Sequence, residues 1–332
     1  MEEYLVNIQH ERLSFFTPAG EVKALNDVSI QMKPGEVLGI VGESGSGKSV
    51  TAYSIMGLTA DNGKLVGGTV EFNGHKIHEM DEKQLREIRG KEVSIIFQDP
   101  MTSLNPVYTI GNQIEEAIKL HTDLTGPAVH ERAVELLSLV GINEPEKRLK
   151  QYPHEHSGGM RQRVMIAIAL ACEPKLLIAD EPTTALDVTI QAQILELMQD
   201  LKEKMGMGII LITHDLGVVA SMCDHIAVMY AGEIVEYGTA DDIFYHPNHE
   251  YTKGLIRSIP KLHEEAYEKL VPIEGQPVDL LNPPAGCSFA PRCDSCMKIC
   301  LKEKPDPIEY DGHFARCWMQ QKKLLEEEQA AV

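Results

Sequence analysis

The loop GESGSGKS at positions 42–49 constrains the fold more than any other stretch of the sequence. It matches the pattern G-x-x-x-x-G-K-[ST] in full, after an apolar run at 36–41 typical of a buried strand and before an apolar-periodic helix at about 48–58. Glycines let the backbone curl so that N–H groups point at phosphate oxygens, and the helix N-terminus adds the positive end of its dipole. Lys48 is expected to reach the β- and γ-phosphates, and Ser49 to ligate Mg²⁺. A simple Gly/Ser turn is the alternative, which the order of strand, loop and helix disfavours.

Two further apolar runs end in side chains that suit phosphate chemistry. In KLLIADEP, 175–182, apolar residues precede Asp180, as in a buried parallel strand that delivers a carboxylate to the ligand-binding edge of a sheet. Asp180 is the expected Mg²⁺ partner, and Glu181 is placed to polarise a water in line with the γ-phosphate. In GIILITHD, 208–215, His214 follows a third strand and could hydrogen-bond the γ-phosphate. Alone, each pattern is more typical of a turn or a strand end; downstream of a phosphate-binding loop, the functional interpretation is favoured.

The composition argues against two classes of partner. The 332-residue chain has 31 Lys+Arg against 50 Asp+Glu, a net charge of −19, which disfavours general affinity for nucleic acid or anionic lipid. Its longest apolar run, 164–172, is far shorter than the roughly 20 residues of a membrane-spanning helix, and the acidic N-terminus lacks the apolar core of a signal peptide. We therefore expect a cytosolic protein of two domains, or one large domain with an appendage, that could dock on a membrane protein.

A fourth motif, HSGGMRQRV at 156–164, lies just upstream of the acidic strand end. Together with the three strand ends, it makes the chain resemble the ATP-binding subunit of an ABC transporter. The motif is similar to the signature loop of that family, although His156 and Met160 stand where the widely found form LSGGQ has Leu and Gln. The resemblance implies that this loop contacts the ATP of a partner subunit through Ser157, Gly158, Gly159 and Met160.

Other motifs of the family fall in register along the chain. Gln98 in IIFQDP resembles the Q-loop glutamine, which the resemblance implies as a Mg²⁺ contact beside Ser49 and Asp180. Phe15, in preference to the adjacent Phe16, takes the place of the aromatic residue that stacks on adenine. The stretch ALDVTIQ at 185–191 resembles the D-loop, with Ala185, Leu186 and Asp187. The remaining predicted ATP contacts are Gly42, Glu43, Ser44, Gly45, Ser46, Gly47, Lys48, Ser49 and Val50.

The resemblance implies an α/β fold: a P-loop NTPase core with an N-terminal antiparallel β subdomain and a helical subdomain. These parts are expected within an ATP-binding domain at 1–255, with the helical subdomain at about 99–165. Two subunits would meet head to tail, so that the P-loop of one and the signature loop of the other enclose each ATP. With Glu181 as catalytic base and His214 as the switch histidine, the chain's own site is expected to hydrolyse ATP. The segment Asp99 to Val107 is the expected surface for a short helix of a membrane subunit.

Five of the seven cysteines lie between 287 and 317, after a Pro- and Gly-rich linker at 271–286. In a reducing cytosol such a cluster indicates a metal site more than a disulfide framework, with unbound thiols as a further alternative. Four thiolates suit either a tetrahedral Zn²⁺ or an iron–sulfur cube, and the spacing does not decide between them. We predict a C-terminal extension at 256–332 whose cysteine motif, 287–317, binds a metal and staples the tail. The other two cysteines, Cys172 and Cys223, are expected to be small buried hydrophobes.

The tail also resembles that of the oligopeptide and dipeptide importer ATPases, in which a proline-rich segment precedes a motif like CSFAPRC. Some members of that family hold a [4Fe–4S] cluster there, which the resemblance implies in preference to Zn²⁺. The sequence departs from the family at Glu250, where those subunits have proline. Cys296 is additional to the family's four tail positions, which fall here at Cys287, Cys293, Cys300 and Cys317.

The function expected from the resemblance is ATP hydrolysis that powers import of peptides from the cytoplasmic face of the cell membrane. The implied partners are a homologous but different ATPase subunit, two transmembrane permease subunits and an extracytoplasmic substrate-binding protein, and no nucleic acid. One alternative keeps the transporter but changes its cargo to nickel, glutathione or sugars. Another is a soluble ABC ATPase that acts on DNA, which would call for a basic surface, an inserted coiled coil or a second cassette; the sequence has none of these.

Overall fold

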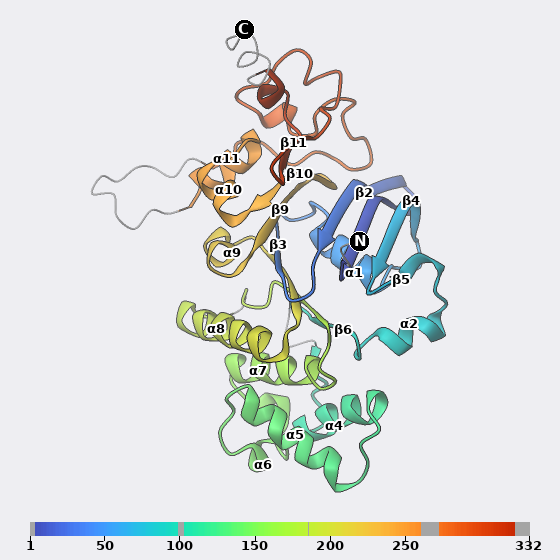
Figure 1. The fold of residues 1–332 in the computed structure, drawn as a ribbon, viewed down its shortest axis with the longest axis vertical. Helices are drawn as coiled ribbons and strands as arrows, with labels where there is room; N and C mark the ends of the chain where they lie inside the picture. The colour runs from blue at the N-terminus through green and yellow to red at the C-terminus, as the bar shows by residue number, and fades with distance from the viewer. Residues whose placement is uncertain (1–3, 99–102, 185, 260–271, 323–332) are drawn as a thin grey trace, which may run out of the picture. The chain divides into compact units, whose positions relative to one another are not determined.

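The computed structural model describes residues 4–98, 103–184, 186–259 and 272–322 (Figure 1). The chain forms two compact units, and each is assembled from segments far apart in the sequence. Unit 1 comprises Met1–Leu5, Met32–Val37 and Phe72–Ile212. Unit 2 comprises Val6–Gln31, Leu38–Glu71 and Thr213–Val332, so the cysteine-rich tail folds together with the N-terminal strands.

The first sheet of unit 2 contains three long strands in the order β2-β1-β4. In β1, Val6, Ile8 and Leu13 are buried while Gln9 and Arg12 are exposed, the alternation of a strand with one face on a core. The bounds of the strands are Val6–Thr17 for β1, Gly20–Met32 for β2 and Gly63–Phe72 for β4.

The second sheet of unit 2 has the order β11-β12-β10-β9-β3. Strand β3, Val37–Val41, is entirely buried and pairs in parallel with β9, His225–Tyr230. Strand β10, Glu233–Thr239, pairs antiparallel with β9 and, on its other side, with β12, His313–Ala315. The tail hairpin of β12 and β11, Ile308–Tyr310, therefore extends a core sheet.

Helices pack closely onto this second sheet. At Gly39 of β3, an added Cβ atom would lie 2.6 Å from Cγ1 of Val219 in α9, so glycine permits the close approach of helix and strand. Figure 1 shows α9 and α10 beside β9. The bounds are Lys48–Ile55 for α1, Leu216–Met222 for α9, Ala240–Tyr245 for α10, Glu250–Arg257 for α11 and Ala290–Arg292 for the short 3-10 helix η3.

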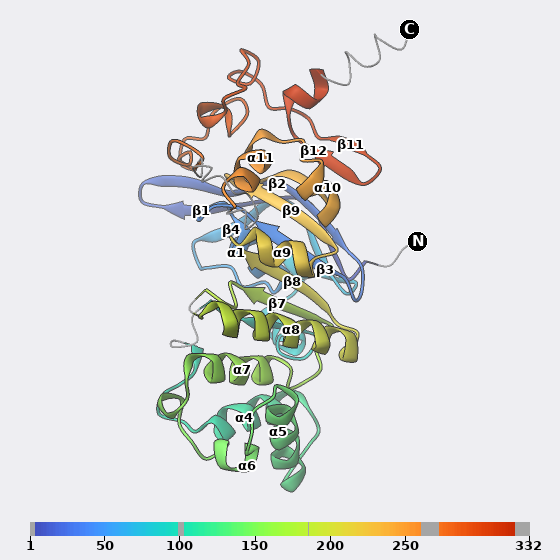
Figure 2. The same ribbon diagram turned by 90° about the vertical axis from the view of Figure 1, so that its left-hand side faces the viewer.

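Unit 1 combines a parallel sheet, in the order β6-β7-β8, with a group of helices. The strands are β6, Val93–Ile96, β7, Leu176–Asp180, and β8, Gly208–Thr213, and the last two are buried throughout. Helices α4, α5 and α7 contact one another, and α8 contacts α7 (Figure 2). The further bounds are His75–Lys76 for β5, Ile77–Glu79 for η1, Glu82–Ile88 for α2, Ile110–His121 for α4, Pro127–Leu139 for α5, Pro145–Arg148 for α6, Pro153–Glu155 for η2, Gly158–Ala169 for α7 and Val188–Met205 for α8.

The three strands predicted beside the phosphate motifs are confirmed as β3, β7 and β8. The helix after the P-loop is shorter than predicted: α1 ends at Ile55, because Gly57 adopts a left-handed conformation (φ 63°) that stops a helix. Within the described ranges, no helix is both long and apolar enough to cross a membrane.

Candidate functional site

The P-loop of unit 2 presents its backbone between β3 and α1. Gly47 precedes α1 with φ 104°, and no side chain in the described part of the chain caps this helix. At Gly42 a Cβ atom would lie 2.2 Å from the carbonyl oxygen of Met229, so the loop requires glycine there. Lys48 is buried, and its Nζ donates to the carbonyl oxygens of Gly42 and Glu43 at 2.8 and 2.9 Å. A cation and an uncapped helix N-terminus thus share one loop, which suits phosphate.

The remaining predicted P-loop residues differ in exposure. Ser44 and Gly45 are exposed, whereas Ser49 and Val50 are half-buried. Ser46 is 4% exposed, and among the described residues its Oγ atom has no hydrogen-bond partner. Its hydroxyl is therefore a polar group that a bound nucleotide could satisfy.

A second group of predicted residues lies in unit 1, where β7 ends. Asp180 is the last residue of the strand and is buried. Glu181 follows with φ 47°, a left-handed conformation that is uncommon outside glycine, and its N–H donates to the carbonyl oxygen of Ile212 at 2.9 Å. Its Oε2 accepts hydrogen bonds from Gln98 Nε2 at 2.9 Å and from Thr184 Oγ1 at 2.8 Å. The structure thus brings Gln98 and Glu181 together at a strained turn that fixes the carboxylate.

The signature loop opens helix α7 in unit 1. Ser157 is the N-cap residue, and its Oγ accepts the backbone N–H of Met160 at 3.4 Å. Ser157 and Gly158 are exposed, whereas His156, directly before them, is buried. The first turn of α7 is therefore open at its surface and capped by its own serine.

The predicted D-loop lies against the signature loop within unit 1. Asp187 caps α8, since its Oδ1 accepts the N–H of Ile190 at 3.0 Å. An added Cβ atom would lie 2.7 Å from Cγ2 of Ile190 at Gly159, and 3.7 Å from Cδ2 of Leu186 at Gly158. The two loops therefore contact each other; the D-loop residue Ala185 lies outside the described residues.

The predicted adenine and switch residues belong to unit 2. The ring of Phe15 packs against Gly63, where a Cβ atom would lie 2.8 Å from its Cε1. Phe16 is 46% exposed and lies under Lys64, whose Nζ is 5.7 Å from the ring centroid. His214 is exposed one residue after β8. Phe16, the residue not favoured for stacking on adenine, is thus more exposed than Phe15.

The predicted coupling surface is described only in part. Residues 99–102 lie outside the described ranges. In the remainder, Leu104 is buried, whereas Val107 is 72% exposed and the following Tyr108 is 53% exposed. These two large apolar side chains are accessible on unit 1.

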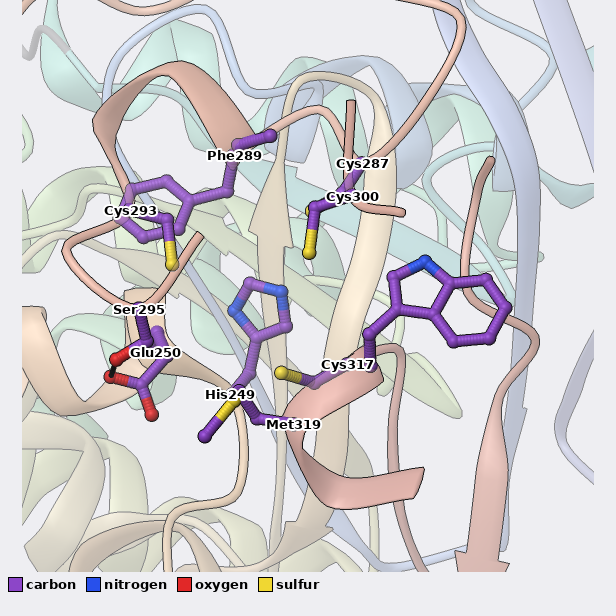
Figure 3. Close-up of a pocket in the computed structure, with 11 residues that line it drawn as sticks. His249, Glu250, Cys287, Phe289, Cys293, Ser295, Cys300, Cys317 and Met319 are labelled. Atoms are coloured by element: carbon purple, nitrogen blue, oxygen red, sulfur yellow. Dashed lines mark hydrogen bonds between the residues drawn. The ribbon is translucent and has the colours of Figure 1, made fainter. Parts of the chain in front are cut away.

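The four predicted metal-binding cysteines line one cavity in unit 2 (Figure 3). Their side chains lie around a common space, with the ring of His249 among them. Cys296 does not line the cavity and is exposed. No group of three or more His, Cys, Asp or Glu side chains within the described ranges is arranged to hold a metal ion. The cavity residues used below are His249, Glu250, Cys287, Phe289, Cys293, Ser295, Cys300 and Cys317.

Burial and backbone N–H groups act in opposite directions on these thiols. Burial raises the pKa of Cys287 to about 11 and that of Cys293 to about 12, and it also raises the pKa of Cys317. Hydrogen bonds from backbone N–H groups counteract this, from Phe289 and Ala290 to Cys287, for example. The N–H of Met297 lies 3.4 Å from Sγ of Cys300. The pocket therefore disfavours bare thiolates but supplies the N–H groups that a ligated thiolate accepts.

Two neighbours of the cysteines were not anticipated as cavity residues. His249 is fully buried, which lowers its pKa to about 4, and its Nδ1 accepts the N–H of Tyr251 at 3.1 Å. Glu250 accepts a hydrogen bond from Ser295 Oγ at 3.3 Å and pairs with Lys253 at 2.7 Å. The only sequence feature that set either residue apart is Glu250 itself, which stands where the peptide importer ATPases have proline. Elsewhere, Cys223 is buried as predicted, whereas Cys172 is only half-buried.

Comparison with known proteins relates both parts of the chain to transporters. The family described as ABC transporter matches residues 25–184, and the family described as oligopeptide/dipeptide transporter, C-terminal region, matches residues 235–300. The dipeptide transport ATP-binding protein DppD of Bacillus subtilis (strain 168) is 51% identical over 323 residues, 97% of this chain and 96% of that protein. The oligopeptide transport ATP-binding protein OppD of the same organism is 54% identical over 317 residues, 95% of this chain and 88% of that protein.

Solved structures share the fold of the larger part of the chain. One is a dimeric ATP-binding cassette in a post-hydrolysis state bound to ADP and Pi, with a TM-score of 0.64 and 29% identity. It covers 71% of this chain and 98% of its own. The structure of cbiO1 from Clostridium perfringens, part of the ABC transporter complex cbiONQ, matches with a TM-score of 0.63 and 29% identity, over 74% of this chain and 92% of its own.

Proposed function

Because the chain belongs to the ABC transporter family, as an ATP-binding protein of the oligopeptide and dipeptide type, we propose that it hydrolyses MgATP and thereby powers the import of peptides. The observation that carries this proposal is the acidic end of β7. There, Glu181 adopts a left-handed conformation directly after the buried Asp180, and Gln98 and Thr184 hold its carboxylate.

The P-loop supplies the phosphate-binding half of the proposed site. Lys48 now donates to two carbonyl oxygens of its own loop, and phosphate oxygens of ATP would replace these acceptors. The N–H groups of the loop and of the first turn of α1 would bind the remaining phosphate oxygens. Ser49, Gln98 and Asp180 would hold Mg²⁺, which neutralises charge that develops on the phosphates. An aromatic ring, Phe15 in our assignment, would stack on adenine.

Glu181 is the proposed general base. Its carboxylate orients a water and takes a proton from it as the water oxygen bonds to the γ-phosphorus. The bond between the γ-phosphorus and the bridging oxygen of ADP breaks at the same time, and the bridging electron pair leaves with ADP. Lys48 and His214 would hydrogen-bond the γ-phosphate oxygens during this displacement. The proton then leaves the carboxylate with the products.

A second ATPase subunit would complete the site. Ser157, Gly158, Gly159 and Met160 form the N-terminus of α7 in unit 1, where Ser157 and Gly158 are exposed, and its N–H groups could bind the γ-phosphate of an ATP held by another chain. The D-loop around Asp187 lies against this loop and would take part in the same contact. The dimeric state of a related cassette supports this arrangement. We propose a homologous, different chain as the partner.

The membrane partners would bind on the helical part of unit 1. Val107 and Tyr108 are exposed apolar residues beside the predicted coupling segment, and a permease helix that covered them would bury this apolar surface. The protein is accordingly proposed as a peripheral subunit at the cytoplasmic face of the membrane, with two permeases and an extracytoplasmic peptide-binding protein.

We further propose that Cys287, Cys293, Cys300 and Cys317 hold a [4Fe–4S] cluster. Their shared cavity and the N–H groups directed at their sulfurs support a ligated state. Four thiolates suit an iron–sulfur cube as well as a single tetrahedral Zn²⁺, and the resemblance of the tail to that of the peptide importer ATPases favours the cube. The cluster would supply four covalent ties between tail segments that contain few apolar residues.

Peptide uptake tests the proposed function. A strain that lacks the gene should lose uptake of a labelled tripeptide, and the wild-type gene should restore it. Glu181→Gln should restore less than about 1% of the rate, because a positioned general base contributes roughly 10²–10⁴-fold. Glu87→Gln, on an exposed face of α2, serves as the matched control and should restore uptake fully. Unchanged peptide uptake in the deletion strain would overturn the cargo assignment, above all if nickel or sugar uptake were lost instead.

Metal content tests the cysteine site. Protein purified without oxygen should be brown and contain about four irons and four inorganic sulfides per chain. Cys296→Ser should keep this content, whereas Cys317→Ser should lose it. Stoichiometric zinc in a colourless preparation would overturn the iron–sulfur assignment, and a metal-free preparation that binds neither would overturn the metal site itself.

A further inference from the structure

Glu43, the second residue of the P-loop, is held at three points within unit 2. Arg292 binds its carboxylate with both terminal nitrogens, Nη1 to Oε2 at 2.6 Å and Nη2 to Oε1 at 2.9 Å. The backbone N–H of Glu43 donates to the hydroxyl of Tyr251 at 2.9 Å, and its carbonyl oxygen accepts from Lys48. Two of the three contacts come from the C-terminal part of the chain, 208 and 249 residues away.

The ion pair between Arg292 and Glu43 has the features of a strong interaction. The Arg292 side chain is only 4% exposed and that of Glu43 is 28% exposed, so solvent screens the pair little. The two parallel N–H···O bonds fix the geometry of both side chains. The hydrogen bonds to Glu43 raise the pKa of Arg292 further, so the arginine stays charged.

Arg292 is itself held in place by the preceding linker and the core. Its Nε donates to the carbonyl oxygen of Glu274 at 2.9 Å, and Nη2 also reaches the carbonyl oxygen of Ile273 at 3.3 Å. Nη1 lies 3.4 Å from the hydroxyl of Tyr230. These bonds fix the guanidinium to the linker and the core. A displacement of the tail would therefore move Arg292 and, through the ion pair with Glu43, the P-loop.

The same arginine is next in sequence to a cysteine that lines the cavity. It ends η3 and directly precedes Cys293, and the turns of this segment begin at Cys287, whose carbonyl oxygen accepts the N–H of Ala290. A second connection runs through aromatic rings: Phe289 lines the cavity and lies 5.3 Å, centroid to centroid, from Tyr251. The cavity and the P-loop are therefore joined by two short, packed routes.

We infer that Arg292 is a positioning residue for the P-loop, through which the folded state of the cysteine cavity sets the affinity for ATP. The first part stands on the Arg292–Glu43 geometry, and the link to the cavity rests on the proposed metal site. Loss of metal ligation would make the Cys287–Cys293 segment more mobile and weaken the ion pair between Arg292 and Glu43. The P-loop would then be less ordered and bind phosphate more weakly.

Nucleotide affinity of the purified chain tests the first part. Arg292→Gln should weaken binding of MgATP about ten-fold, the scale of one hydrogen-bonded charge pair, and Arg292→Lys less, because lysine retains the charge without the paired bonds. The double variant with Glu43→Gln should bind no more weakly than the weaker of the two single variants. Arg86→Gln removes an exposed ion pair with Glu82 and should bind as wild type does.

A split in the kinetic constants of the assembled transporter separates positioning from loss of fold. Arg292→Gln should raise KM for ATP about ten-fold and change kcat less than two-fold, because it removes binding common to the ground and transition states. A lowered kcat with unchanged KM, or ATP affinity equal to that of Arg86→Gln, would overturn the assignment. Peptide uptake by the wild type would be unaffected by that result, so the proposed function would stand.

A double-mutant comparison tests the link to the cavity. Cys317→Ser lies far from Arg292 in sequence, and in otherwise wild-type protein it should weaken ATP binding in the same direction. In the Arg292→Gln background it should have a clearly smaller effect, because the connection through Arg292 is already broken and only the aromatic contact between Phe289 and Tyr251 remains. Cys317→Ser with unchanged affinity would overturn the link between cavity and P-loop, and fully additive effects of the two substitutions would overturn the assignment of Arg292 as its route.

Discussion

The two helices that begin at predicted phosphate-binding loops, α1 and α7, satisfy their first turns differently. Helix α1 follows Gly47 without a side-chain cap from the described residues, and Lys48 lies against the carbonyl oxygens of its own loop. Helix α7 is capped by Ser157, which accepts the N–H of Met160. The difference indicates that the P-loop keeps the backbone N–H groups at the start of α1 available for a ligand. In the signature loop, by contrast, Ser157 already accepts an N–H group of α7 before a partner subunit binds.

Both helices have a buried titratable side chain nearby that, among the described residues, lacks a hydrogen-bond partner. Burial raises the pKa of Glu11, near α1, to about 8. The hydroxyl of Ser54 opposes this rise, although it donates its own hydrogen bond to Thr51 at 2.8 Å. Burial and the nearby Arg148 lower the pKa of His156, directly before α7. An acid and a base are thus both driven toward their neutral forms.

The largest expected effect comes from Lys48→Ala. Removal of the buried cation should weaken MgATP binding at least about 100-fold, the loss expected for a charged hydrogen-bond donor to phosphate. Lys83→Ala, an exposed residue of α2, is the control. Calorimetric titration measures both. Tight ATP binding by Lys48→Ala would show that the P-loop does not need its own cation to bind phosphate, and would contradict the proposed difference between the P-loop and the signature loop.

Glu11→Gln should change how stability depends on pH. Because the folded pKa, about 8, lies above the ordinary value of 4.5, the folded state binds the proton more tightly. The stability from this group is complete below about pH 4.5 and is lost as pH rises through 8, by an amount on the order of a few kcal/mol. The amide cannot ionise, so the variant should lose less unfolding free energy than the wild type between pH 6 and 9.

Chemical denaturation at several pH values measures this difference. The control is Glu21→Gln, an exposed residue at the start of β2, whose pH profile should follow that of the wild type. Parallel curves of unfolding free energy against pH for Glu11→Gln and the wild type would show that Glu11 is ionised in the folded state. Burial would then not hold both Glu11 and His156 in their neutral forms.

His156→Leu should stabilise the protein slightly. The substitution removes two buried ring nitrogens without partners in the described ranges, and such groups cost about 1–3 kcal/mol each to leave unsatisfied. We expect a gain of about 1 kcal/mol in unfolding free energy, with His154→Leu, an exposed neighbour, near zero. A loss of stability in thermal denaturation would mean that His156 makes a contact that the leucine cannot replace.

Ser157→Ala should have a small effect on stability and a selective effect on activity. Loss of the N-cap should cost about 1 kcal/mol, while ATP binding to the P-loop stays as in the wild type. ATP hydrolysis by the assembled transporter should fall, because the serine would face the partner's γ-phosphate. Ser138→Ala, within α5, controls for the loss of a helix hydroxyl. Weakened ATP binding by Ser157→Ala alone would contradict the division of roles between the loops.

Local patterns predicted much of the fold, including the strands that carry the proposed nucleotide-binding residues. The strand and helix around the P-loop and the ends of β7 and β8 each depend on residues that are close in sequence, so the order and spacing of residues suffice to predict them. Local patterns do not decide between Phe15 and Phe16. Adjacent residues of a strand face opposite sides, and the sequence does not show which side meets a ligand.

Long-range contacts could not be predicted in this way. The ion pair between Glu43 and Arg292 joins residues 249 positions apart, and neither belongs to a periodic pattern. The tail hairpin of β11 and β12 has strands of three residues, too short for alternation to appear. The clustered cysteines indicated a shared site, but no pattern in the sequence placed Arg292 against the P-loop.

The most direct test of the central claim is phosphate release from MgATP by purified transporter that contains this chain. The wild-type complex should hydrolyse ATP, and a complex with Glu87→Gln should match it. A complex with Glu181→Gln should bind ATP as tightly but release phosphate at least about 100-fold more slowly, because water would lack its base. A rate near that of the wild type would contradict the assignment of the β7 end as the catalytic centre.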